Sequence, residues 1–393
     1  MLTSAGHLTY CSNIHAGESW ADHFAALKQY FPAVKKKISP NMSMGIGLRL
    51  SNEASLDLIK DDQLKNFSAW LTENNAYVFT MNGFPYGGFH HVRVKDQVHT
   101  PDWTTTDRVE YTIRLFRILE KLLPDDMDGG VSTSPLSYRH WFKSADALKA
   151  ARQKATANIL LVAEELIRIR KNSGKLLHLD IEPEPDGILE SGAEFIDWYE
   201  NELLPAGSGL LLKAHIRLCY DVCHFAIGYE DQEKVIRQLK QKGIGIGKIQ
   251  ISAALKGNFA QAHERAAVKQ AFATYNEPVY LHQVVARKDD GSLLHYPDLP
   301  EALADADDPE VKEWRAHFHV PVFAEQFGIL ESTQQQIRQL IEMQKNSPMT
   351  SHLEIETYTW EVLPSFLKLP LHESIIRELQ WVMELLDAGN PKS

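Results

Sequence analysis

The chain has 393 residues, of which 44% are hydrophobic and 24% are charged, with 22 glycines and 18 prolines. These proportions are those of a soluble globular protein, and they exclude a collagen-like chain, a disordered chain and a repeat array. The formal charge of -11, from 52 acidic and 41 basic residues, repels a phosphate backbone, so we expect no nucleic-acid partner.

The three cysteines are odd in number and lack the spacing of metal ligands, which predicts a reducing compartment and no disulfide framework. The first residues, MLTSAGHLTYCSN, show no basic region followed by an apolar stretch, so no signal peptide is expected. No run approaches the roughly 18 apolar residues of a membrane span. We therefore expect a cytoplasmic protein that does not insert into a membrane.

Short apolar runs alternate along the chain with longer segments of helical periodicity. The clearest helical segments are 19–37, 108–123 and 145–170, and Ser51 and Asn52 are candidate caps for a further helix. The expected strands, in chain order, are Leu8–Asn13, Met44–Leu50, Ala76–Met81, Gly130–Thr133, Leu176–Glu182, Ala214–Tyr220, Gly245–Ser252 and Leu353–Tyr358.

Eight strands alternating with helices predict an α/β fold, a (β/α)8 TIM barrel, because βαβ units close with one hand and bury both faces of a parallel sheet. An open doubly wound sheet is the alternative. That fold usually carries a glycine-rich GxGxxG turn between a strand and a helix, and the chain has none.

One region breaks this alternation, between the seventh and eighth expected strands. It contains a strand-like run at Val279–Ala286, the turn sequence KDDGS, and the segment HFHVPVF at His317–Phe323. A structureless loop of such length is uncommon in a compact domain. We expect residues 1–393 to form a single barrel domain, with 254–330 an insertion that contains a β-hairpin over the barrel mouth.

Active sites of such barrels lie at the carboxyl ends of the strands. Acids, histidines and amides gather there, and oxygen ligands together with imidazole suit a divalent cation. The polar residues at the expected strand ends are His15, Asn82, Ser132, Thr133, Glu182, Asp221, His224, Gln250, Ser252, Glu354 and Glu356.

Each acidic candidate also has a structural interpretation. Glu182 ends an apolar strand before Pro183, where a carboxylate seldom stays unpaired, so it is a ligand or general base, or else a salt-bridge or capping residue. Asp221 and His224 could be an ordinary helix cap and a core histidine. Glu354 and Glu356 share one strand face. Inside a barrel they would have to share a proton, a cation or a basic partner, and we favour the cation.

Further candidates lie on segments that could face the same mouth. His317 and His319 share a face of an extended segment, and aromatic residues such as Tyr86 could wall an organic ligand. Core packing is the alternative for every one of these side chains. The candidates for substrate binding are His15, Asn82, Tyr86, His90, His282, His317 and His319.

With these residues in place, the sequence resembles the xylose-isomerase-like superfamily of sugar phosphate isomerases, epimerases and apurinic endonucleases. In that superfamily a Glu, an Asp with a nearby His, a further His and a final Glu bind divalent metals. The resemblance implies a cation (Mn, Zn, Fe, Co or Mg), with Glu182 and Glu356 as catalytic acids. The chain departs from the superfamily pattern at Gln250, where the family usually has histidine. The implied ligands are Glu182, Asp221, His224, Gln250 and Glu356.

A narrower resemblance is to the EboE-like family of metabolite-traffic proteins. It rests on motifs spread along the whole chain, among them NGFPYGGFH, LDIEPEPDG, YDVCHFA, HFHVPVF and HLEIETYTWEVLP. This resemblance implies a pathway that moves or processes precursors of secondary metabolites, with other proteins of the same gene cluster as partners.

These observations leave three functions to compare. One is a metal-dependent isomerase or epimerase that moves a proton on a small organic metabolite. The second is a barrel that binds or carries such a metabolite without catalysis, which the substitution at Gln250 and the large insertion favour. A DNA-repair phosphodiesterase is disfavoured, because the charge is negative and the strand ends provide few histidines.

Overall fold

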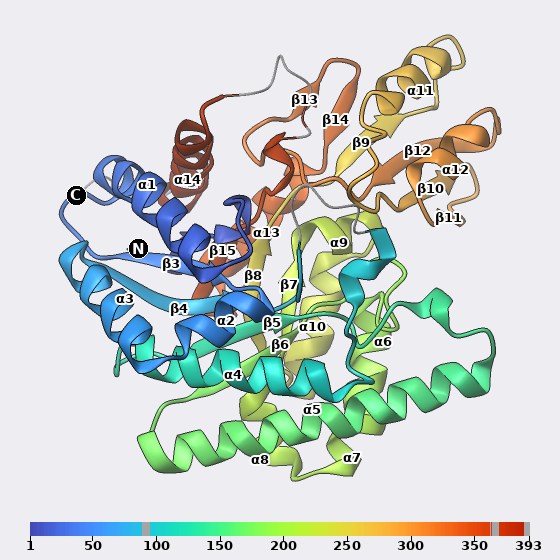
Figure 1. Ribbon diagram of the computed structural model, residues 1–393. Coiled ribbons are helices and arrows are strands. Elements are labelled where there is room, and N and C mark those ends of the chain that lie inside the picture. The colour runs from blue at the N-terminus through green and yellow to red at the C-terminus, as the bar shows by residue number, and fades with distance from the viewer. Residues whose placement is uncertain (89–94, 362, 364–368, 389–393) are drawn as a thin grey trace.

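The protein, described here by a computed structural model over residues 1–88, 95–361, 363 and 369–388, contains eight parallel strands in a nearly closed barrel (Figure 1). All eight strands expected from the sequence are present, in the spatial order β2-β15-β8-β7-β6-β5-β4-β3. They are β2 (Gly6–Tyr10), β3 (Met44–Arg49), β4 (Ala76–Asn82), β5 (Gly129–Thr133), β6 (Leu177–Ile181), β7 (Ile216–Asp221), β8 (Ile246–Ile251) and β15 (His352–Ile355). A short β1 (Leu2–Thr3) pairs antiparallel with β2.

The barrel closes between β2 and β3, where backbone pairing is sparse. A single bridge joins Cys11 to Gly47. The Thr9 side chain completes the closure, because its hydroxyl donates to the Gly45 carbonyl at 2.9 Å and accepts from the Gly47 amide at 3.0 Å. A hydroxyl on the barrel's inner face thus replaces part of the missing strand ladder.

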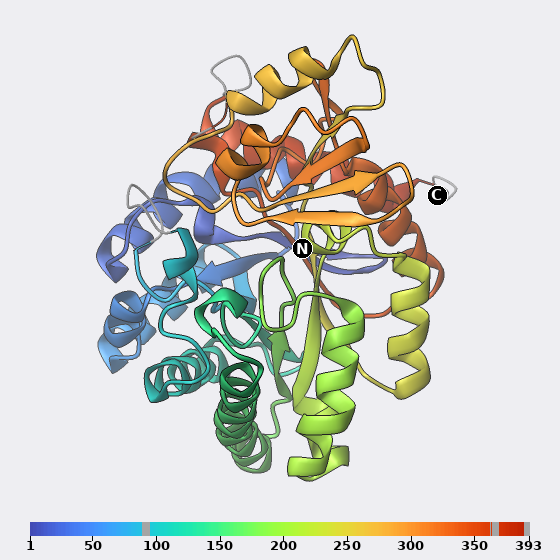
Figure 2. The same ribbon diagram turned by 90° about the vertical axis from the view of Figure 1, so that its right-hand side faces the viewer.

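Helices surround the barrel on its outer side, as Figure 2 shows. The cap expected at Ser51 is present: its hydroxyl accepts from the Ala54 amide at 3.0 Å. No described helix has both the length and the apolar composition needed to cross a bilayer. The helices are α1 (Trp20–Ile38), α2 (Asn52–Leu58), α3 (Asp61–Glu73), α4 (Thr106–Leu122), α5 (Ala145–Ser173), α6 (Gly192–Trp198), α7 (Leu204–Ala206), α8 (Gly209–His215), α9 (Val222–Ile227), α10 (Gln232–Lys242), α13 (Gln334–Asn346) and α14 (Leu371–Asp387).

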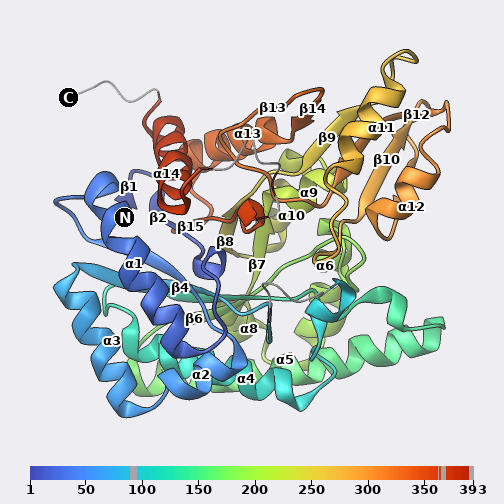
Figure 3. The ribbon, with the colours of Figure 1, turned by 45° about the horizontal axis from the view of Figure 1, so that its top comes forward.

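A second, antiparallel sheet lies between β8 and β15 in the chain and on one side of the barrel in space (Figure 3). Its hairpin β10–β11 turns at Gly291, whose φ of +83° favours glycine. The strand-like run at Val279–Ala286 becomes a strand only from Val284 onward. The sheet consists of β9 (Leu255–Asn258), β10 (Val284–Lys288), β11 (Leu293–Tyr296), β12 (Val311–Ala316), β13 (Gln326–Phe327) and β14 (Leu330–Ser332), with α11 (Arg265–Ala273) and α12 (Leu299–Ala304) beside it.

A buried ion pair occupies the barrel interior below the strand ends. Lys248 on β8 is paired with the carboxylate of Glu354 on β15 and donates to the Ser132 hydroxyl at 2.9 Å. Gly47 makes room for this pair, because a Cβ at that position would lie 1.8 Å from Glu354 Oε1. Of the alternatives open for Glu354, the structure therefore supplies the basic partner and not a cation shared with Glu356.

Candidate metal and substrate site

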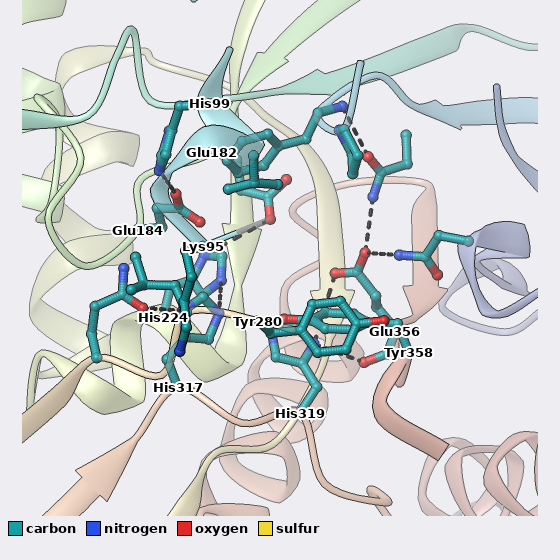
Figure 4. A pocket seen from close by; sticks show the side chains of 17 residues that line it. Lys95, His99, Glu182, Glu184, His224, Tyr280, His317, His319, Glu356 and Tyr358 are labelled. Atoms are coloured by element: carbon teal, nitrogen blue, oxygen red, sulfur yellow. Dashed lines mark hydrogen bonds and ion pairs between the residues drawn. The ribbon is translucent and has the colours of Figure 1, made fainter. Parts of the chain in front are cut away.

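A cavity of about 70 Å³ opens at the carboxyl ends of the barrel strands (Figure 4). The barrel contributes Asn82, Glu182 and Glu356 to its wall, and the segments before and after the second sheet's β10–β12 contribute Tyr280, Gln283, His317 and His319. The two sheets therefore build one cavity together.

Three carboxylates meet at the barrel side of this cavity. Glu182 directly follows β6, Asp221 ends β7 and Glu356 directly follows β15, and one oxygen from each lies within 4.8 Å of the others. All three are buried. Burial, and then the charge of Asp221, raises the pKa of Glu356 to about 8. Burial followed by the charges of Glu356 and Asp221 raises the pKa of Glu182 well above its ordinary value. Such a group must hold protons or a cation.

Neighbouring donors fix these carboxylates while leaving oxygens for a ligand. Asp221 Oδ1 accepts from the Ser252 hydroxyl at 2.7 Å and from the His224 amide at 3.0 Å, where it caps α9. Among the described residues, Asp221 Oδ2 and Glu182 Oε2 have no hydrogen-bond partner although both are buried. Unpaired buried carboxylate oxygens are costly, which favours a bound cation.

Glu356 is held by two amides. Its Oε1 accepts from Asn13 Nδ2 at 2.6 Å and from Asn82 Nδ2 at 2.9 Å. Asn82 ends β4, and its own Oδ1 accepts from the Phe84 amide at 3.0 Å, which fixes the direction of its Nδ2. Asn13 lies just past β2. The sequence predicts the end of the first strand at this position but does not mark Asn13 as a site residue.

Three imidazoles form the opposite side of the cavity, and each is oriented by an oxygen at Nδ1. His224 Nδ1 faces the Pro183 carbonyl at 3.0 Å, and His319 Nδ1 faces the Glu356 carbonyl at 3.1 Å. His317 Nδ1 faces Gln283 Oε1 at 2.8 Å. Since these oxygens only accept, each Nδ1 carries the hydrogen and each Nε2 presents a lone pair.

These Nε2 atoms converge. His224 Nε2 and His317 Nε2 are 3.1 Å apart, and His319 Nε2 has no hydrogen-bond partner among the described residues. Burial and the neighbouring His224 lower the pKa of His317 well below its ordinary value, and burial lowers the pKa of His319 to about 4, so both rings are neutral. Facing lone pairs repel unless a proton or a cation lies between them or beside them. Three further groups of potential ligand atoms lie within 4.8 Å of one another here. They are Asp221, His224 and His319; Glu184, His224 and His317; and Cys223, His317 and His319.

An acid and a histidine outside the strand ends also line the cavity. Glu184 Oε1 and His99 Nε2 are 2.9 Å apart, and both side chains are buried. At the mouth, Lys95 Nζ pairs with Asp298 at 2.5 Å. His99 and Lys95 lie on a connection between β4 and α4, where strand-end reasoning does not look, and no periodic pattern marks them.

Gln250 lies beside this carboxylate group and not in the cavity wall. It is buried on β8, level with Asp221 on β7 and Glu354 on β15, and its amide lowers the pKa of Glu356. Gln250 therefore contacts the carboxylate group through the side chain of Glu356.

Other candidates from the sequence lie outside the cavity wall. His282 is held by protein on both nitrogens, at 2.9 Å from the His317 carbonyl and 2.8 Å from Glu277 Oε1. His15 faces the Tyr10 hydroxyl at 3.1 Å and stacks on Tyr30. Tyr86 packs on Tyr111. His90 lies outside the described residues.

No family model matches the chain, and no curated protein matches it. Among solved structures, the zinc-bound IOLI protein superposes with a TM-score of 0.50 at 12% identity, covering 97% of this chain and 98% of that chain. A xylose isomerase domain protein from Planctomyces limnophilus gives 0.48 at 9% identity, covering 98% and 97%. The probable 3-DHS dehydratase AsbF from Bacillus anthracis gives 0.45 at 10% identity, covering 95% and 97%.

The strand order and the likeness to the IOLI protein define the class of fold. The chain forms a (β/α)8 barrel. At such low identity the likeness extends to the fold alone, so the chemistry has to be argued from the cavity itself.

Proposed function

We propose that the cavity binds a divalent metal ion through Glu182, Asp221 and Glu356, with His224 and Gln250 completing the ligand set. The observation that carries the proposal is the convergence of buried carboxylate oxygens and imidazole Nε2 lone pairs that lack protein donors. Nδ1 contacts to fixed oxygens are the arrangement that orients histidine ligands in metal sites. Mixed carboxylate and imidazole donors suit Mn, Fe, Co or Zn better than Mg. The solved IOLI structure contains zinc.

We propose further that the protein acts on a small organic metabolite by proton transfer, as an isomerase or epimerase does. A bound divalent ion would polarise a carbonyl or hydroxyl oxygen of such a molecule. Both candidate bases line the cavity, and Glu182 is the better placed because its Oε2 has no protein partner among the described residues. Glu356, held at Oε1 by Asn13 and Asn82, would keep a fixed orientation.

His317 and His319 would take part in binding the metabolite or a second ion. The buried Glu184–His99 pair offers a further proton donor beside them. Asn82 is committed to Glu356, which makes it a positioning residue for the acid. His15, Tyr86 and His282 would support the walls from behind.

The experiment is solvent deuterium exchange into a panel of ketoses and hydroxy-ketones, with metal-loaded protein. Exchange that is lost in Glu182→Gln but kept in the surface variant Asp197→Asn supports proton transfer. Stoichiometric metal without exchange on any compound of the panel would instead favour the alternative, a non-catalytic barrel that binds and carries the metabolite. Gln250, where the superfamily usually has histidine, and the large insertion favour that alternative.

The domain organisation and the cellular role are proposed as well. We infer that residues 254–330 act as an insertion that covers the mouth of a single barrel domain spanning 1–393, since Tyr280 and His317 line the cavity. The EboE-like motifs suggest a cytoplasmic role in metabolite traffic, with proteins of that gene cluster as partners. Affinity capture of those proteins from cells that express the cluster tests this role.

A further inference from the structure

A second group of potential metal ligands lies at the opposite end of the barrel. Asp128 directly precedes β5, His178 is the second residue of β6 and His352 is the first residue of β15. One ligand atom from each lies within 4.8 Å of the others. Glu182 follows His178 by four positions, or about 13 Å along an extended chain, so this group is separate from the cavity.

The His178 side chain has the orientation of a metal ligand. Its Nδ1 is 2.6 Å from Asp180 Oδ1, and both side chains are fully buried. Its Nε2 points to Asp128 Oδ2 at 3.5 Å, too far for a good hydrogen bond. Histidines that bind a metal through Nε2 typically donate a hydrogen bond from Nδ1 to a carboxylate, which orients the ring toward the metal.

The barrel interior leaves room for the Asp180 carboxylate at a glycine. A Cβ at position 247 would lie 1.8 Å from Asp180 Oδ1, so Gly247 is needed to admit the carboxylate. The second oxygen of Asp180 has no hydrogen-bond partner among the described residues. A buried carboxylate with one donor and no other partner is expensive unless nearby positive charge offsets it.

His352 approaches the same point from the neighbouring side of the barrel. Its Nε2 is 3.2 Å from Asp128 Oδ1, and its ring packs against Phe79 and His178 with centroid distances of 5.0 and 5.1 Å. Asp128 is 24% exposed, whereas the two histidines are buried, so solvent reaches the group through Asp128.

An arginine also contacts this cluster. The guanidinium of Arg217 donates to Asp128 Oδ2 at 3.0 Å. This contact weakens the attraction of Asp128 Oδ2 for a cation. Asp128 Oδ1 faces His352 and Ser351.

We propose that Asp128, His178 and His352 form a second metal site, which binds Zn²⁺ and clamps β6 to β15 across the amino-terminal end of the barrel. Two imidazoles and one carboxylate are a donor set for Zn²⁺, with water as a fourth ligand. The site lies too far from the cavity to touch a substrate there, so its role is to stabilise the barrel.

The test uses full-length Asp221→Asn/Glu356→Gln protein, in which the proposed cavity site is disabled. After dialysis against Zn²⁺, plasma mass spectrometry should find about one equivalent of zinc, and X-ray absorption should show two imidazole ligands. Adding His352→Gln, or the milder Asp128→Asn, should remove that zinc. His215→Gln, a change at another buried histidine at the same end of the barrel, should not.

A folded Asp221→Asn/Glu356→Gln protein that retains no zinc would overturn the second site. Zinc that persists in both Asp128→Asn and His352→Gln would overturn it as well. Neither result bears on the metal site in the cavity. That site is tested by the difference in metal content between wild type and Asp221→Asn/Glu356→Gln.

Discussion

His224 Nε2 and His317 Nε2 face each other at 3.1 Å, although the Nδ1 atom of each ring is directed at an oxygen that can only accept a hydrogen bond. Neither ring can then donate to the other while both are neutral. While both rings are neutral the contact is repulsive, and it becomes favourable when a cation takes the lone pairs. The pair therefore couples metal binding to stability.

His317→Gln tests this coupling. The amide can donate to His224 Nε2, so the metal-free variant should be at least as stable as metal-free wild type. Its metal affinity should fall by about 10-fold to 100-fold, as for other losses around a metal site. Calorimetric melting with and without chelator, together with metal titration, measures both effects. A variant that melts far lower without metal would show that His317 is a packing residue.

Gln250→His tests the position where the chain departs from the superfamily pattern. Imidazole binds borderline metals more tightly than an amide oxygen does, so the variant should bind Zn²⁺ or Co²⁺ about 10-fold more tightly. Competition with a coloured chelator measures the affinity. Unchanged or weaker binding by a folded variant would mean that residue 250 does not reach the ion.

Glu378 on α14 predicts how the free energy of unfolding depends on pH. It is buried, its Oε1 accepts from the Thr357 hydroxyl at 2.7 Å and the Val322 amide at 3.1 Å, and burial raises its pKa from 4.5 to about 8. A raised folded-state pKa gives stability that is full below pH 4.5 and is lost as the pH rises through 8.

Glu378→Gln keeps both hydrogen bonds and cannot ionise. Between pH 5 and 9, its free energy of unfolding should therefore decline by roughly 4 kcal/mol less than that of wild type. Urea denaturation across this pH range measures the difference, and Glu373→Gln, at an exposed position on the same helix, is the control. Parallel pH profiles for wild type and Glu378→Gln would contradict the assignment.

The Lys248–Glu354 pair predicts a strong stability effect inside the barrel. Lys248→Met leaves the buried carboxylate of Glu354 without its cation, which should cost about 3–5 kcal/mol. Lys248→Met/Glu354→Gln removes both charges and should recover much of the loss. Equilibrium denaturation of the three proteins measures this, and a double variant no more stable than Lys248→Met would show that the pair's role is packing.

The strands and the barrel were predictable because each strand is a short apolar run flanked by polar turns, and because parallel strands need helical crossovers. The same rule placed Glu182, Asp221 and Glu356 at one rim. Their convergence follows from parallel strands ending together, so it needs no knowledge of side-chain packing.

The rest of the site depends on contacts between segments far apart in the chain. His99 meets Glu184 because the segment Lys95–His99 lies at the cavity wall, and no spacing in the sequence encodes that approach. Glu354 and Glu356 share a strand face, as alternation requires, but only the neighbouring strand shows that Lys248 neutralises the deeper acid. The contact of His282 Nδ1 with the His317 carbonyl is likewise a tertiary contact.

The most direct test of the central claim is the zinc or cobalt stoichiometry of metal-stripped protein after titration, compared between wild type and Asp221→Asn. Asn keeps the shape of the Asp221 side chain but removes the negative charge that Asp221 adds to those of Glu182 and Glu356. The account therefore predicts that about one equivalent of metal is lost while the fold is retained. Asp197→Asn, on the surface, should change nothing. An Asp221→Asn protein with the full stoichiometry and affinity of wild type would contradict a metal site in the cavity.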